Sequence, residues 1–479
     1  MQFGQPEHTS GSVGSAAPLP RSRLREFSDD PIACMRKLQA EQGHVAVLEE
    51  GHQRLVFVFG PHYNQQVLTD TDSFHSCFFL IRGPRNSAQR RLTCGLLSMN
   101  GDRHRQQRRM VMDPFQKRSF VHYHEPLCRV TTDLLNGWQP GESINLHTEM
   151  TRHMLQVTSG LLFGFDVPEM AYRVAESLHR WTELNHQLGM WAFIADPEYS
   201  QNYDVLLRQA DELEGEIRQM IEYRRSSGRY GNDVLSILLR VLAEGGELTE
   251  EELIGHTALL FGAAHMTTAH TFTWTLFLLA QHPSIMREVL GEIQSTMPGS
   301  APTLDEIGRM ALMERVVKAS MLILPASAYS QRVTARPVQL GPLHLPRGTP
   351  VVFSQFMTHR LPDLFPEPDR FWPDRWLTAA PSPYAYLPFG AGPRMCLGGP
   401  LAMVILRTAL PMILKRFRLS LVPHSAVNGK VISTMLMPVE SVAMHVAEQD
   451  GQFQAQPVTG NIHSLVDLHE IPTAARRAA

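Results

Sequence analysis

One cysteine of this chain lies in a segment whose composition favours a reactive thiolate. Residues 389–398 read FGAGPRMCLG, with Cys396 near the end. Two glycines and a proline favour a tight turn before Cys396, and the apolar residues after it predict a helix from about Gly398 to Phe417. Unpaired N–H groups at a helix N-terminus favour a thiolate, which is a strong iron ligand. From these residues alone, a buried structural cysteine accounts for the segment about as well.

The segment resembles the haem-binding loop of the cytochrome P-450 (haem-thiolate) superfamily. The shared pattern, which continues downstream with Leu401-Ala402, is Phe389-x-x-Gly392-x-Arg394-x-Cys396-x-Gly398. The resemblance covers roughly residues 28–446 and implies a single-domain cytochrome P-450 fold, mainly α with a small β region. It implies haem b (iron protoporphyrin IX) as the cofactor, with the Cys396 thiolate as axial ligand of the iron. By the same resemblance Phe389 shields the sulfur, Arg394 reaches a propionate and Gly398 completes the cofactor-binding loop.

The resemblance also assigns further residues to the haem propionates. His104 and Arg108 lie in Gly101-x-x-His104-x-x-x-Arg108-Arg109, which is similar to the family helix that holds the propionates. Arg332, after Pro325, is similar to a third partner. The assignment is physically sound because buried carboxylates need charge-assisted hydrogen bonds. Without the cysteine loop, the basic run would be interpreted as a solvated helix face.

A long helix is predicted over Leu253–Ala280, and its middle resembles the oxygen-binding stretch of the family. Residues 263–268 read AAHMTT, so that Thr267 falls on the family threonine. Thr267 and Thr268 are the predicted catalytic residues. Met266 occupies the position of an acid that, with the alcohol, delivers protons to bound oxygen in the family. The alternative is that these threonines only bond back to helix carbonyls.

Other positions depart from the family pattern near the cysteine loop. Ala319 and Leu322 replace a Glu and an Arg on the helix before Pro325, and Ile405 replaces a Glu that commonly follows the cysteine. The missing pair normally binds the arginine that here is Arg375. Apolar packing can replace a buried ion pair at little cost. Arg375 then needs another acceptor, such as a backbone carbonyl.

The elements that must position these residues follow from periodicity and capping signals. Residues 44–60 predict a β-hairpin, and residues 120–325 are mostly helical. Short strands are predicted at Arg332–Leu340 and Val351–Phe353. Residues 361–376, which we call the meander, combine many prolines with aromatic residues and predict an ordered, packed loop. No linker divides this part of the chain.

Composition excludes several classes of protein. Lys and Arg number 44 against 47 Asp and Glu, so no basic excess points to nucleic acid. Five cysteines without metal-ligand spacing favour a reducing, cytoplasmic location. The first twenty residues contain no apolar signal segment, and histidines within 253–280 argue against a membrane span. We expect a mobile N-terminal tail over 1–27, the cytochrome P-450 domain over 28–446 and a C-terminal extension over 447–479.

The resemblance predicts a bacterial-type soluble monooxygenase that oxidises an apolar or amphipathic small molecule. Electrons would come from a separate ferredoxin or flavoprotein reductase. Pocket-lining residues are expected within 74–92 and 176–204. One alternative is a haem-thiolate enzyme for peroxide-driven oxidation, dehydration or rearrangement, since Met266 replaces the acid. Another is a non-catalytic partner of a second enzyme, against which the retained Cys396 and Arg394 argue.

Overall fold

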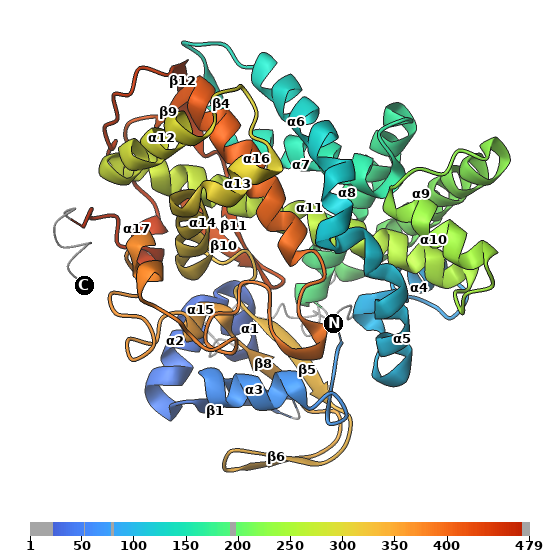
Figure 1. Ribbon diagram of the computed structural model, residues 1–479. Helices are drawn as coiled ribbons and strands as arrows, with labels where there is room; N and C mark the ends of the chain where they lie inside the picture. The colour runs from blue at the N-terminus through green and yellow to red at the C-terminus, as the bar shows by residue number, and fades with distance from the viewer. Residues whose placement is uncertain (1–22, 52, 78–80, 192–197, 472–479) are drawn as a thin grey trace, which may run out of the picture.

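Helix α11, Glu250–Gln281, runs through the middle of the molecule, and the other helices pack around it (Figure 1). Its start is fixed by a capping box in which Thr249 and Glu252 each accept the other's backbone N–H. It ends before Pro283, which cannot continue the hydrogen-bond ladder. Most of its side chains are buried, so its polar residues face neighbouring helices rather than solvent.

The structure is a computed structural model that describes residues 23–51, 53–77, 81–191 and 198–471. Within these residues the other α-helices are α1 Arg23–Asp29, α2 Pro31–Gln42, α3 Pro61–Thr69, α4 Ala88–Leu92, α5 Gly101–Val111, α6 Phe120–Asn136, α7 Leu146–Phe163, α8 Pro168–Trp191, α9 Glu198–Ser227, α10 Val234–Ala243, α12 Pro283–Thr296, α13 Leu304–Arg309, α14 Ala311–Ile323, α15 Gln355–Thr358, α16 Gly399–Arg416 and α17 Ile462–Leu465.

The strands form small sheets at the edges of this helical body. They are β1 Val45–Glu50, β2 Gln53–Val58, β3 Phe74–His75, β4 Ser143–Asn145, β5 Ser330–Thr334, β6 Val338–Leu340, β7 Leu343–Leu345, β8 Pro350–Phe353, β9 Phe417–Leu421, β10 Asn428–Ile432, β11 Met435–Val439 and β12 Ala443–Glu448. The largest sheet has the order β1-β2-β8-β5-β3, with β2 and β8 parallel. The predicted hairpin is confirmed by the β1–β2 register, in which Val45 pairs with Val58.

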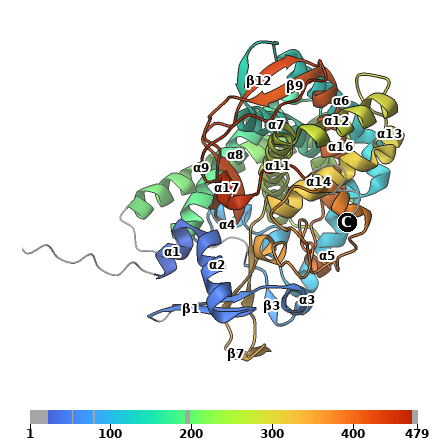
Figure 2. The same ribbon diagram turned by 90° about the vertical axis from the view of Figure 1, so that its left-hand side faces the viewer.

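The prediction of a mainly α fold with a small β region is confirmed, and three local differences follow from chain chemistry. The strand expected over Arg332–Leu340 is broken into β5 and β6, because Pro337 has no N–H for a ladder. Helix α1 occupies the last part of the segment expected to be a tail. Residues after β12 pack against the helical body (Figure 2).

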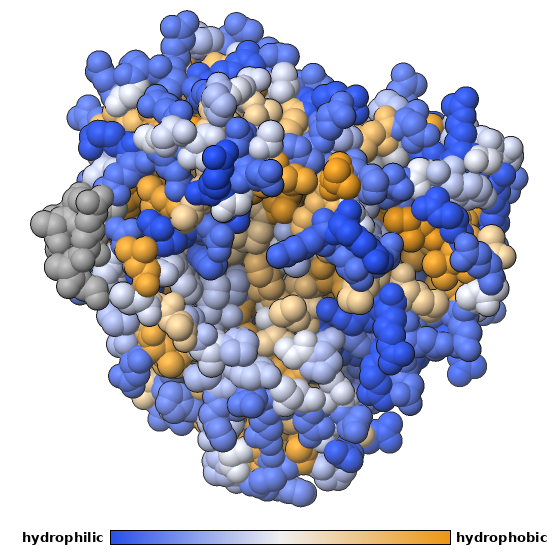
Figure 3. All heavy atoms as spheres, in the orientation of Figure 1, coloured by the Kyte–Doolittle hydropathy of each residue, from blue (hydrophilic) through white to orange (hydrophobic). Residues whose placement is uncertain are grey.

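The meander is packed as predicted, since Phe365 and Phe371 are buried within it. Figure 3 shows that one face of the molecule is mostly hydrophilic, with apolar side chains in a hollow near the centre of that face. The hollow lies beside the lower end of α16 as drawn in Figure 1. Among the described residues, no helix combines the length and apolar character that a membrane span requires.

Candidate active site

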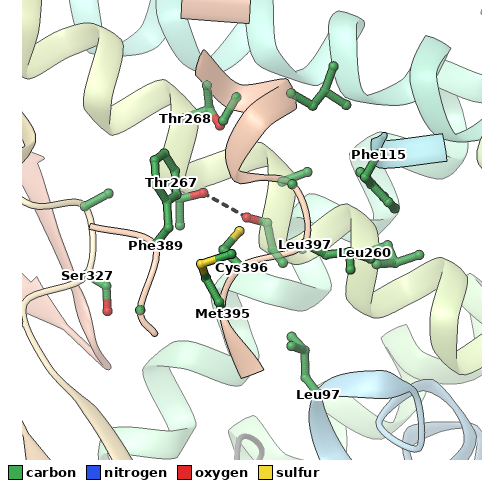
Figure 4. Close-up of a pocket in the computed structure, with 18 of the residues that line it drawn as sticks. Leu97, Phe115, Leu260, Thr267, Thr268, Ser327, Phe389, Met395, Cys396 and Leu397 are labelled. Carbon is green, nitrogen blue, oxygen red and sulfur yellow. Dashed lines mark hydrogen bonds between the residues drawn. The ribbon is translucent and has the colours of Figure 1, made fainter. Parts of the chain in front are cut away.

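A cavity of about 350 Å³ lies between α11 and the residues that precede α16. We call residues 386–398 the cysteine loop; Figure 4 shows its Cys396, Phe389 and Leu397 around the same cavity as Thr267 and Leu260 of α11. The cavity brings together nearly all of the predicted site residues. Those that line it are Arg108, Thr267, Thr268, Arg332, Phe389, Arg394, Cys396 and Gly398.

The turn of the cysteine loop depends on close backbone contacts. The N–H of Cys396 donates to the carbonyl of Phe389 at 2.8 Å and closes the turn. Gly392 has φ +72°, and a Cβ there would lie 2.6 Å from the carbonyl oxygen of Leu68. A larger residue would therefore push the loop away from α3. Arg108 on α5 donates to the carbonyl of Met395 at 2.7 Å, which fixes the loop next to the cysteine.

Cys396 is exposed to the cavity, and opposing effects act on its thiol. Burial within the protein raises its pKa above the ordinary value. The backbone N–H groups of Gly398 and Gly399 and the charge of Arg108 lower the pKa, but burial outweighs them. The helix N-terminus alone therefore does not produce the thiolate that the sequence suggested. A metal cation bound at this sulfur would favour the thiolate.

A basic cluster formed by His104, Arg108, Arg332 and Arg394 lies beside the cysteine loop. Burial and, to a smaller extent, the nearby Arg394 together lower the pKa of Arg332 to about 10. Burial, together with the charges of the three cluster arginines and of Arg105, lowers the pKa of His104 to about 4. The predicted propionate residues therefore lie close enough to repel one another. His104 is buried beneath the cluster and is not among the residues described as lining the cavity.

The basic cluster fits an anionic cofactor. Among the described residues no carboxylate lies within ion-pair distance of Arg108, Arg332 or Arg394. Arg394 donates to Asn100 Oδ1 at 2.7 Å and to the carbonyl of Met99, while its buried Nε has no hydrogen-bond partner there. Arg332 donates to the carbonyl of Gln331 at 2.8 Å. Buried guanidinium groups need hydrogen-bond acceptors, and two propionates would supply charged ones.

The threonines of α11 line the same cavity as the cysteine loop. Thr267 Oγ1 donates to the carbonyl of Ala263 at 2.8 Å, as the structural alternative for these threonines predicts. Thr267 and Thr268 both line the cavity as well, so the back-bond does not remove them from it. Met266 is buried at 5% exposure and is absent from the described lining.

The face of α14 that lacks the family ion pair is apolar and buried. Ala319 and Leu322 are each 1% exposed, as the departure from the family pattern suggested. Arg375 donates to the carbonyl of Glu367 at 2.7 Å and to that of Pro366. Backbone carbonyls of the meander are thus the expected replacement acceptors. One ion pair, Arg315 Nη2 to Asp374 Oδ1 at 3.4 Å, still joins α14 to the meander.

The segments predicted to line the pocket contribute less than expected. From 176–204 His186 lines the cavity, and no described residue of 74–92 does so. Residues 78–80 and 192–197 lie outside the described residues. Much of the apolar lining comes from other elements, for example Met154, Thr158 and Leu161 on α7. Their i, i+4, i+7 spacing marks one helix face, but the sequence does not indicate what that face meets.

Comparisons with known proteins agree with this geometry. The family described as Cytochrome P450 matches residues 23–445. A cyclooctat-9-en-7-ol 5-monooxygenase from Streptomyces melanosporofaciens is 28% identical over 87% of this chain and 90% of that protein. A pentalenene oxygenase from Streptomyces avermitilis is 28% identical over 90% of this chain and 96% of that protein. The solved haem domain of cytochrome P450DA has a TM-score of 0.78 at 22% identity, covering 91% of this chain and 98% of that chain.

The class of protein is defined by two findings. A cysteine loop, a basic cluster and a long central helix surround one cavity, and the family match covers most of the chain. The chain belongs to the cytochrome P450 family. It is a monooxygenase-type oxidoreductase of the haem-thiolate class, with haem b as its cofactor and a cysteine thiolate as axial ligand.

Proposed function

We propose that this enzyme inserts one oxygen atom into an apolar or amphipathic small molecule held in the cavity. The observation that carries the proposal is the composition of the lining. Outside the three arginines of the basic cluster, the described lining residues carry no formal charge and most are apolar. Burial lowers the pKa of His186 to about 4, so this lining histidine is neutral at pH 7. An apolar ligand gains most from such a surface.

The proposed roles follow the positions of the side chains. Cys396 supplies the axial thiolate, and Phe389 covers the loop side of the sulfur. The basic cluster holds the propionates. Bound haem b supplies the oxidising chemistry, and the protein supplies the axial ligand and the shaped cavity.

Thr267 and Thr268 are proposed to act on the distal side of the cavity. Thr267 donates its proton to Ala263 O, so its oxygen lone pairs can accept a hydrogen bond from a water or hydroxyl in the cavity. Thr267 Oγ1 would then orient that water or hydroxyl group within the cavity. Electrons are proposed to come from a separate ferredoxin or flavoprotein, and this partner and the cytoplasmic location stay predictions from the sequence.

The names of the relatives narrow the proposed substrate. One relative is named for oxidation of cyclooctat-9-en-7-ol and another for oxidation of pentalenene. Both names refer to cyclic compounds with little polarity, which suits the apolar lining of this cavity. We therefore propose a cyclic hydrocarbon or its mono-alcohol as the substrate class.

Spectral titration of the ferric protein tests the substrate class. Cyclooctat-9-en-7-ol, pentalenene, a long-chain fatty acid and a free amino acid would be added separately, and the shift of the haem absorption measured. Saturable shifts with a cyclic compound and none with the amino acid support the proposal. Equal or stronger binding of the amino acid would contradict it.

The role of Cys396 has its own test. Cys396→Ala should remove the thiolate-type absorption of the reduced carbon monoxide complex. The only other sulfur of the loop is the thioether of Met395, which cannot form a thiolate. Cys128→Ala, at a half-buried cysteine on α6, is the matched control and should leave the spectrum unchanged. An unchanged spectrum in Cys396→Ala would remove the residue from the site.

Peroxide-supported oxidation is a second candidate. It is favoured by the absence of Asp and Glu from the described cavity lining, since the usual relay includes a carboxylate. In this reaction peroxide supplies both the oxygen atom and the oxidising equivalents, and water is the second product. Product formation with hydrogen peroxide alone should then exceed that with ferredoxin, its reductase and oxygen.

A further inference from the structure

The chain continues beyond the family match at residue 445 into a segment that packs on the helical body. We call residues 449–471 the C-terminal strap. In Figures 1 and 2 it runs from the end of β12 along the side of the molecule to α17. Ile462, Leu465 and Val466 are buried in the main core, and Thr459 forms a bridge with Ala426. The strap is therefore an integral part of the folded domain.

Arg360, the second residue after α15, has a buried cationic side chain that contacts the strap. Its Nη2 donates at 2.6 Å to the carbonyl of Ile323 at the end of α14 and at 2.6 Å to the carbonyl of Leu465 in the strap. Its Nε lies 3.0 Å from Asp369 Oδ1 of the meander. A buried guanidinium is stable only when acceptors surround it. The strap supplies one of the acceptors that Arg360 requires.

The strap also binds the meander directly. Arg370 Nε donates to Asp467 Oδ2 at 2.9 Å, and the N–H of Asp467 donates to the carbonyl of Asp369 at 2.9 Å. Asp369 thus contacts Arg360 through its side chain and the strap through its backbone. The middle of the meander is therefore joined to the strap by one side-chain bond and one backbone bond.

His359 connects this junction to the cysteine loop. Its Nδ1 lies 3.0 Å from the carbonyl of Leu322, and the N–H of Leu387 donates to its Nε2 at 2.8 Å. Burial lowers the pKa of His359 to about 3, so the ring is neutral and can donate at one nitrogen while it accepts at the other. The His359–Arg360 dipeptide therefore joins the end of α14 to the cysteine loop on one side and to the strap on the other.

We propose that the C-terminal strap, through its bonds to Arg360 and above all through the Asp467–Arg370 pair, replaces the missing Glu-Arg pair as the anchor of the meander and the cysteine loop. Ala319 and Leu322 provide no charge. Arg375 bonds only to carbonyls of the meander itself among the described residues. The strap bonds restrain the meander and, through His359, the position of the loop that carries Cys396. This inference concerns how the haem site is held and does not depend on the substrate.

The test uses the full-length, haem-loaded protein. Asp467→Ala removes the carboxylate that binds Arg370, whereas Asp467→Glu keeps one. Asp450→Ala is the matched control, because it breaks another aspartate–arginine pair of the strap, Asp450 with Arg418 at 2.9 Å, beside β9 rather than the meander. Three quantities are measured: the rate of haem transfer to apomyoglobin, the thiolate-type fraction of the reduced carbon monoxide complex, and the reduction potential of the haem.

We expect Asp467→Ala to release haem about tenfold faster, with a smaller thiolate-type fraction and a shifted potential, because one charge-assisted bond is lost. Asp467→Glu should restore all three quantities, and Asp450→Ala should resemble the wild type. A chain that ends at Val458 should show a larger effect than Asp467→Ala. Equal effects in Asp467→Ala and Asp450→Ala would overturn the proposal, since the strap would then contribute only general stability. Wild-type behaviour of Asp467→Ala would overturn it too, even if the shortened chain does not fold.

Discussion

Met266 and Thr267 are neighbours on α11 but lie in different environments: Thr267 lines the cavity, and Met266 is buried outside the described lining. Successive residues on an α-helix point about 100° apart, so neighbours such as Met266 and Thr267 can face different surroundings. A carboxylate at position 266 would therefore lie at a buried site. Methionine at position 266 therefore places no charge at this buried site.

Met266→Glu tests this placement. The buried carboxylate lacks a prepared partner, so its pKa should rise above the unfolded value of about 4.3. A raised folded-state pKa means that the unfolded state ionises first, and stability is lost as the pH rises through this window. Urea unfolding should show Met266→Glu to be less stable than Met266→Gln at pH 7.5 and close to it at pH 4.5. An equal difference at both pH values would mean that position 266 is hydrated.

The basic cluster can be tested by removing its charges. Arg332→Leu and Arg394→Leu should each weaken haem binding by about 1.5–3 kcal/mol, because a propionate loses a charge-assisted hydrogen bond. That range corresponds to roughly tenfold to 150-fold in haem affinity. Haem transfer to apomyoglobin measures the loss. Arg105→Leu is the control, since Arg105 is exposed and pairs with Asp102 at the surface; a loss equal to that of the other variants would exclude a specific role for the cluster.

The apolar face of α14 predicts the outcome of restoring the family residues. Leu322→Arg should cost about 3–5 kcal/mol, because it buries an unpaired cation. Adding Ala319→Glu should recover part of this loss, since the two positions lie one turn apart and Arg375 gains an acceptor. The double variant should hold haem no better than the wild type. Melting curves and haem content of the variants decide this.

Leu377→Arg is the control for that series, because Leu377 is 61% exposed and the same substitution there should change stability by less than about 0.5 kcal/mol. Wild-type stability of Leu322→Arg would show that the α14 face is open to solvent.

His153 on α7 predicts a loss of stability in mild acid. Burial lowers its pKa to about 4, and neither ring nitrogen has a hydrogen-bond partner among the described residues. The unfolded chain binds a proton near pH 6.5, so stability present above that pH is lost as the pH falls toward 4. Between pH 7.5 and 5.5 this residue should account for about 1 kcal/mol of lost unfolding free energy.

His153→Leu should remove that part of the pH dependence, as measured by urea unfolding at the two pH values. The exposed His62 provides the control substitution, His62→Leu. A pH dependence unchanged in His153→Leu would indicate that water reaches the ring.

The sequence was informative where chemistry depends on spacing within one segment. The cysteine loop, the Thr249 capping box and the replacement acceptors of Arg375 all involve residues close together in the chain, and the structure agrees with each. The cavity lining was predicted less well, because Met154 and Thr267 meet only when α7 packs on α11. The strap was assigned only as an extension, since no local pattern indicates that Leu465 lies beside Arg360, 105 residues earlier.

The long sequence separation of the strap's contacts has a consequence for the order of folding. Leu465 is made after nearly every residue that it contacts, and Ser464 accepts a hydrogen bond from Arg36, 428 residues earlier. Contacts of such long range form late, because a large loop must close before they stabilise anything. The strap is therefore expected to bond to the meander late in folding, and the cysteine loop to be restrained by the strap only after those bonds have formed.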